Sequence, residues 1–77
     1  MARKQVRKHF GDDVVERELR AVGGSVDAFV IDISGAAPAI MFRDKNGHLR
    51  DIFVSDDDLY EEMLSYLRRR NAPELDA

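Results

Sequence analysis

The sequence contains no cysteine, and this absence excludes disulfide bonds and cysteine-ligated metal sites, the usual supports of small secreted domains. Long apolar runs are also missing, because no stretch approaches the roughly 20 residues that a membrane-spanning helix requires. The basic N-terminal segment is not followed by the apolar stretch of a secretory signal. We therefore expect a cytoplasmic protein that makes no contact with a membrane.

Residues typical of catalytic and cofactor sites are also scarce. His9 and His48 are the only histidines, and neither has a neighbour at the spacing of a metal site or a nucleophile. A serine triad is a matter of spatial arrangement, and no feature of the sequence supports one. Gly23-Gly24-Ser25 lacks the lysine and the spacing of a phosphate-binding loop. We expect no enzymatic activity, no catalytic residue, no bound metal and no cofactor.

The length of 77 residues predicts one domain over residues 1–77. A chain of this size buries only about 60 to 65 per cent of its unfolded surface, so its stability margin is modest. It also has little room for a ligand cavity of several hundred cubic ångströms.

The centre of the chain predicts an antiparallel meander of three strands. Residues 26–33 are rich in β-branched and aromatic side chains, which favours a first strand that ends at the Gly and Pro of residues 34–38. A second strand follows at 39–43. Residues 44–47 end in Asn-Gly, the preferred sequence of a tight hairpin turn, and 48–54 form the third strand.

Alternation along these strands places apolar side chains on both sheet faces. We expect helices to cover one face, and another element or a second copy of the chain to cover the other. Phe29, Phe42 and Phe53 are expected to pack in the core rather than to stack on nucleic-acid bases. Phe29, Ile31 and Ile33 share one face of the first strand, as do Ile40 and Phe42 in the second. In the third strand, Ile52 and Val54 lie on the opposite face from Leu49 and Phe53. The sequence does not fix the hairpin register, which decides which of these two sets shares a face with Phe42.

Apolar residues at helical spacing flank the meander on both sides. The first helix is predicted from Asp13 to Val22, with Asp12 or Asp13 as its N-cap and Gly23-Gly24 as its end. Residues 1–10 form either preceding helical turns or a basic arm.

The second helix is predicted to begin at the N-cap Ser55 and to run to about Arg70, with Asn71 as a C-cap and Pro73 preventing continuation. Residues 72–77 are expected to be a frayed tail. The predicted fold class is therefore α+β, a helix, a three-stranded antiparallel meander and a helix (αβββα), with the helices on one sheet face or on opposite faces.

Acidic residues are concentrated at the start of the second helix. Their spacing does not match a calcium-binding loop, and negative charge in a first helical turn suits the helix dipole. We interpret this cluster chiefly as structural, and secondly as an acidic surface that binds a basic protein partner. The residues are Asp56, Asp57, Asp58, Glu61 and Glu62.

Basic residues form two groups, which are candidate contacts for nucleic acid or an acidic partner. A short basic arm neutralises phosphates without reading sequence, and positive charge at a helix C-terminus suits the dipole. The acidic cluster would repel the same phosphates, and no nucleic-acid-binding motif accompanies the arm. The residues are Arg3, Lys4, Arg7 and Lys8 in one group and Arg68, Arg69 and Arg70 in the other.

The hypothesis that best fits the sequence is a small intracellular, non-catalytic regulatory or adaptor protein. It would bind another protein stoichiometrically and form a homodimer. The first alternative is a nucleic-acid-associated protein that uses the basic N-terminal segment. The second is an acidic inhibitor of a nucleic-acid-binding enzyme, which a net charge of −3 supports only weakly.

Overall fold

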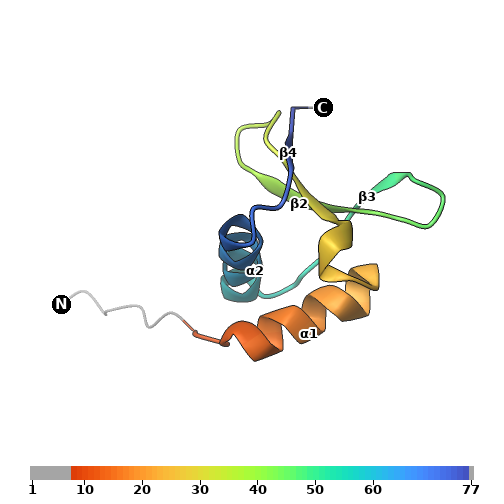
Figure 1. Ribbon diagram of the computed structural model, residues 1–77. Helices are drawn as coiled ribbons and strands as arrows, with labels where there is room; N and C mark the ends of the chain where they lie inside the picture. The colour runs from red at the N-terminus through yellow and green to blue at the C-terminus, as the bar shows by residue number, and fades with distance from the viewer. Residues whose placement is uncertain (1–7, 77) are drawn as a thin grey trace.

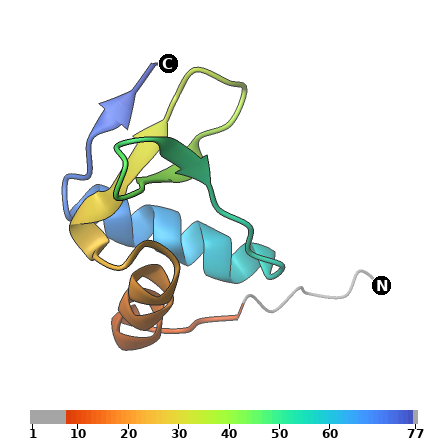
Figure 2. The ribbon, with the colours of Figure 1, turned by 90° about the vertical axis from the view of Figure 1, so that its right-hand side faces the viewer.

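The computed structural model describes residues 8–76, which form two α-helices and a four-stranded sheet. Both helices lie on the same side of the strands (Figures 1 and 2), so the molecule has two layers and the predicted α+β class is confirmed. The elements in order are α1 (Asp12–Gly23), the 3-10 turn η1 (Val26–Ala28), β1 (Phe29–Asp32), β2 (Ala39–Arg43), β3 (Leu49–Asp51), α2 (Asp57–Arg69) and β4 (Glu74–Leu75).

The sheet has the strand order β3-β2-β1-β4, in which β1, β2 and β3 are antiparallel neighbours and β4 runs parallel to β1. The prediction of a purely antiparallel three-stranded sheet is therefore wrong, and so is that of a frayed tail from residue 72. Asn71, with φ 59°, turns the chain back after α2. The carbonyls of Pro73 and Leu75 then accept hydrogen bonds from the N–H groups of Ile31 and Ile33, both at 2.8 Å.

The first and third strands are shorter than predicted. Val26–Ala28 forms a 3-10 turn because the Ser25 hydroxyl accepts a hydrogen bond from the Asp27 N–H, which holds the chain out of the extended conformation. Residues 52–54 leave the sheet to reach α2. The second strand is confirmed as predicted. The hairpin turn is also confirmed, since Asp44 Oδ1 accepts hydrogen bonds from the N–H groups of Asn46 and His48, and Gly47 has φ 82°.

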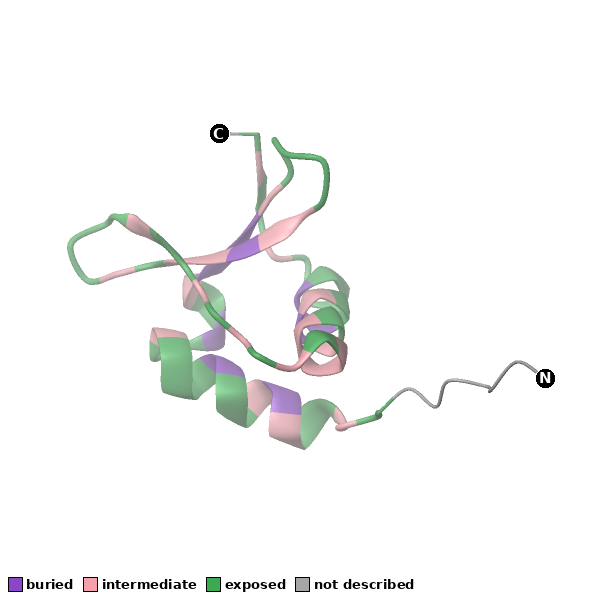
Figure 3. Cartoon of the chain, turned by 180° about the vertical axis from the view of Figure 1, so that it is seen from behind, coloured by how far each residue is buried: buried purple, intermediate pink, exposed green. Residues whose placement is uncertain are grey.

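The register resolves which side chains face the helices. Phe29 pairs with Phe42 and Ile31 with Ile40, and the two phenylalanine rings lie 6.0 Å apart between centroids. Figure 3 shows the buried residues gathered where the helices meet the sheet. Ile33, predicted to share this face, lies beyond the end of β1 and is 44% exposed. The buried core consists of Val15, Leu19, Val26, Phe29, Ile31, Ile40, Met63, Tyr66 and Leu67.

The helix ends differ in part from the prediction. No side chain caps α1, which begins after Gly11, and the expected Asp12 or Asp13 cap is wrong. The Gly24 N–H bonds to the carbonyl of Arg20 and ends that helix, as predicted. Asp56, not Ser55, caps α2: its Oδ1 accepts the N–H groups of the second and third residues that follow it. Residues 8–10 are not helical.

Candidate interaction surfaces

The sheet face that points away from both helices carries three rows of side chains. The register places these side chains together, because residues paired across neighbouring strands point to the same side. The middle row is Val30, Met41 and Asp51; one end row is Leu75, Asp32 and Ala39; the other end row is Arg43 and Leu49. We call these eight residues the open face.

The centre of the open face is apolar. Val30 is only 6% exposed, although it is not part of the core on the helix side. Met41, Leu49 and Leu75 are half-buried. Binding a partner that removes apolar surface of this kind from water lowers the free energy of the system.

Phe53 lies beside β3 and is 89% exposed. Its neighbours Ile52 and Val54 both pack against the core, so Phe53 between them points away from it. The prediction that Phe53 joins the core is therefore wrong, because an extended segment offers only alternate residues to one side. An exposed aromatic side chain is a typical anchor of a protein interface.

The open face carries opposite charges at its two ends. Asp32 lies in the row with Ala39, and Arg43 lies two rows away beside Leu49. Asp32 Oδ1 accepts hydrogen bonds from the N–H and the hydroxyl of Ser34, at 2.9 and 2.6 Å. Arg43 donates to the carbonyl of Gly47 at 3.1 Å. Both charged groups are thereby held near the ends of their strands.

The acidic cluster on α2 contacts the chain's own segment 8–10. Lys8 Nζ lies 2.8 Å from Asp56 Oδ2, and the Lys8 N–H donates to Asp58 Oδ2 at 3.0 Å. The Phe10 N–H donates to Glu62 Oε2 at 2.7 Å. The hydrogen bond from the Lys8 ammonium lowers the pKa of Asp56, and the same contact raises the pKa of Lys8. Asp56, Asp58 and Glu62, all predicted partner contacts, thus bond to segment 8–10 of the same chain.

The basic end of α2 is also partly used within the molecule. Arg69 donates to both carboxylate oxygens of Asp12, at 3.1 and 2.9 Å, which joins α2 to α1 and lowers the pKa of Asp12. The guanidinium of Arg70 lies 3.7 Å from Asp27. Both guanidinium groups lie over the ring of Tyr66, at 5.6 and 5.7 Å from its centroid. Arg68 is exposed. Arg3, Lys4 and Arg7 lie outside the described residues.

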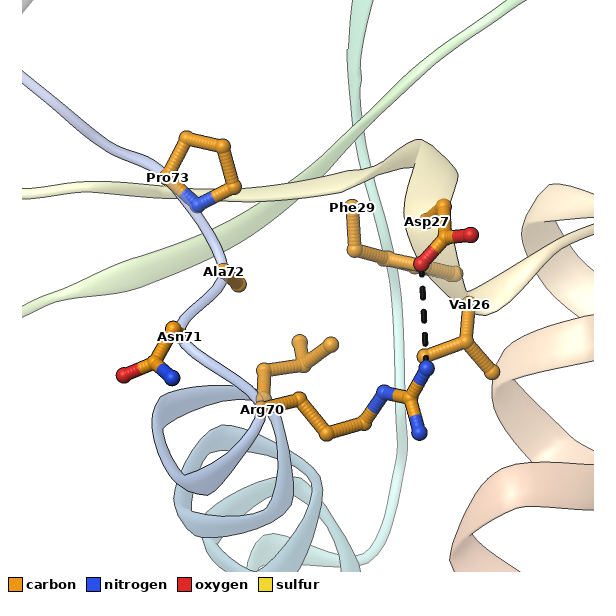
Figure 4. A pocket seen from close by; sticks show the side chains of 8 residues that line it. Val26, Asp27, Phe29, Arg70, Asn71, Ala72 and Pro73 are labelled. Atoms are coloured by element: carbon orange, nitrogen blue, oxygen red, sulfur yellow. Dashed lines mark ion pairs between the residues drawn. The ribbon is translucent and has the colours of Figure 1, made fainter.

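A small pocket of about 90 Å³ lies between η1 and the chain that leads to β4 (Figure 4). Val26, Phe29 and Leu67 are among the residues that line it, as are Arg70 and Asp27, which form an ion pair. Ligand sites typically have volumes of roughly 300 to 1,000 Å³ and enclose most of the ligand. This pocket is therefore too small to enclose a typical metabolite or cofactor.

Within residues 8–76, no group of three or more histidine or acidic side chains is placed to hold a metal ion. Neither helix in that range has the length and apolar character needed to cross a bilayer. Comparisons of the chain with models of protein families, with curated proteins and with solved structures found no match.

Proposed function

We propose that this chain is a small intracellular regulatory or adaptor protein that binds by its open face, and that the occupant of this face is a second copy of the chain. The observation that carries the proposal is the apolar centre of a sheet face whose opposite side holds both described helices. Val30 and Met41 supply that centre, and Leu49 and Leu75 add apolar area in the end rows.

The size of the open face sets the expected affinity. Four strands and three rows cover about 15 Å by 14 Å, or roughly 200 Å². A stable interface usually buries roughly 800 Å² on each partner. Phe53 enlarges the apolar area, but the association remains weak. We expect a homodimer with a dissociation constant on the order of 100 µM.

A second copy suits the charges on this face better than a partner of one charge sign. The face carries both Arg43 and the acids Asp32 and Asp51, so a symmetric arrangement can match opposite charges. The net charge of −3 is too small to oppose self-association strongly. The nucleic-acid alternative has less support, because Lys8 and Arg69 are paired with carboxylates within the fold.

The test is the solution mass of the protein, measured by sedimentation equilibrium from about 10 µM to about 1 mM. We expect the weight-average mass to rise with concentration. Met41→Lys places a charge at the centre of the open face and is expected to keep the protein monomeric. Val22→Lys is the matched control, because Val22 is an exposed apolar residue on α1, and it should behave as the wild type.

A wild-type chain that stays monomeric throughout this range contradicts the proposal. Salt distinguishes the nucleic-acid alternative, since binding to DNA or RNA through the basic residues would weaken steeply with added salt. An interface with an apolar centre responds much less.

A further inference from the structure

The edges of the sheet are poor sites for self-association. Antiparallel pairing of β3 with its own copy along its whole length centres on Arg50, which would then face the Arg50 of the copy. Like charges directly opposite each other destabilise strand pairing. At the other edge, β4 has only two residues and follows Pro73, which has no N–H to donate. Association through the face is therefore favoured over association through an edge.

The open face has a direction because its charges lie at opposite ends. Asp32 and Arg43 are on neighbouring strands and four residue steps apart along the strand axis, which corresponds to about 13 Å. Val30 and Met41 lie in the row between them. The face therefore has an acidic end, a middle row in which Val30 and Met41 are apolar and Asp51 lies at the β3 margin, and a basic end.

This direction distinguishes the two symmetric ways of stacking one open face on another. A two-fold axis parallel to the strands places Arg43 against Arg43 and Asp32 against Asp32. A two-fold axis perpendicular to the strands, in the plane between the sheets, places each Arg43 against the Asp32 of the other copy. The second arrangement brings the two Asp51 side chains toward each other at the margin, where water screens their repulsion.

We infer that two copies of this chain stack open face to open face with their strands antiparallel across the interface, so that Arg43 of each copy pairs with Asp32 of the other. This inference rests on the proposed function, because it specifies the geometry of the same homodimer. Two attractive contacts offset one screened repulsion, whereas the parallel arrangement has only like-charge contacts. The apolar middle supplies affinity, and the end charges select the orientation.

Charge reversal tests the arrangement. Arg43→Glu and Asp32→Arg should each weaken dimerisation about tenfold, because each creates two like-charge contacts. The double variant restores both contacts and should dimerise within about threefold of the wild type. Asp32→Asn keeps an acceptor for Ser34, so it serves as the conservative variant, with an expected weakening of about threefold. Circular dichroism of each variant checks that it folds.

The possible outcomes separate this inference from the proposed function. A monomeric wild type overturns both. A dimeric wild type whose affinity is unchanged by Arg43→Glu overturns only the arrangement, because replacing one facing like-charge pair by another is what the parallel stacking predicts. Weakening by both single variants without recovery in the double variant also overturns the arrangement. Recovery in the double variant supports it.

Discussion

The two faces of the sheet are built from the same strands but differ in how far their side chains are buried. On one face, Phe29 and Ile31 are buried beneath side chains of α1 and α2. On the other, Val30 of the same strand is 6% exposed without belonging to the core beneath the helices, while Met41 and Leu75 remain half-exposed. Burial on the helix-covered face therefore contributes most to the stability of the fold, and the open face keeps apolar area available for association.

The largest expected difference between the faces concerns stability. Leu67 is 0% exposed and lies in the core, so Leu67→Ala should lower the free energy of unfolding by about 2 to 5 kcal/mol. Leu75→Ala removes the same atoms from the open face and should cost less than about 1 kcal/mol. Urea denaturation of both variants at low protein concentration measures this contrast. Equal losses would mean that the two faces do not differ as described.

A smaller effect is expected at Gly23, the last residue of α1, which lies against β1. A Cβ atom added at Gly23 would lie 2.7 Å from a ring carbon of Phe29, which is fully buried and has little room to move. Gly23→Ala should therefore lower stability by about 1 to 3 kcal/mol, although alanine is the better helix former.

Adding Phe29→Leu removes the ring and should reduce the cost of Gly23→Ala, which thermal or urea denaturation of the double-mutant cycle can detect. A net stabilisation by Gly23→Ala alone would show that the packing between α1 and β1 is looser than the structure indicates.

The smallest expected effect is electrostatic and lies at the margin of the helical layer. The Arg69 guanidinium lowers the pKa of Asp12 below its ordinary value of about 3.9. Such a carboxylate adds stability above its unfolded pKa and loses it as pH falls through its folded pKa. Asp12→Asn should lower the melting temperature slightly at pH 7, and this difference should shrink as the pH falls below the ordinary carboxyl pKa of about 3.9 and through the lowered pKa of Asp12.

Asp57→Asn removes an exposed carboxylate at the start of α2 and controls for the change in net charge. A melting-temperature difference between Asp12→Asn and the wild type that stays constant from neutral to acidic pH would contradict the ion-pair explanation.

The parts of the fold that were predictable are those encoded by neighbouring residues. The Asn46-Gly47 turn located the hairpin, alternation assigned Ile40 and Phe42 to one face, and Gly23-Gly24 marked the end of α1. Charge blocks were visible in the sequence, but contacts such as Phe10 to Glu62 join residues 52 positions apart and leave no local pattern.

The features that were not predicted depend on the position of the chain in the folded structure. β4 contains only Glu74 and Leu75, and it forms because the turn at Asn71 brings them beside an unpaired edge of β1. Asp56 caps α2 although Ser55 is an equally good cap by type, since the Asp56 carbonyl accepts the first helical hydrogen bond. The apolar character of both faces was predictable, but the exposed position of Phe53 was not.

The short strand β4 has a consequence for edge-to-edge aggregation of the chain. It occupies the edge of β1, so the two edges of the described sheet are β3, which centres on Arg50, and β4, which has only two residues. A chain truncated before Pro73 would lack β4, and the edge of β1 would then be exposed in addition to the edge of β3. Filaments grow by repeated strand addition at sheet edges, so the truncated chain is expected to form fibres more readily than a chain that retains Glu74 and Leu75.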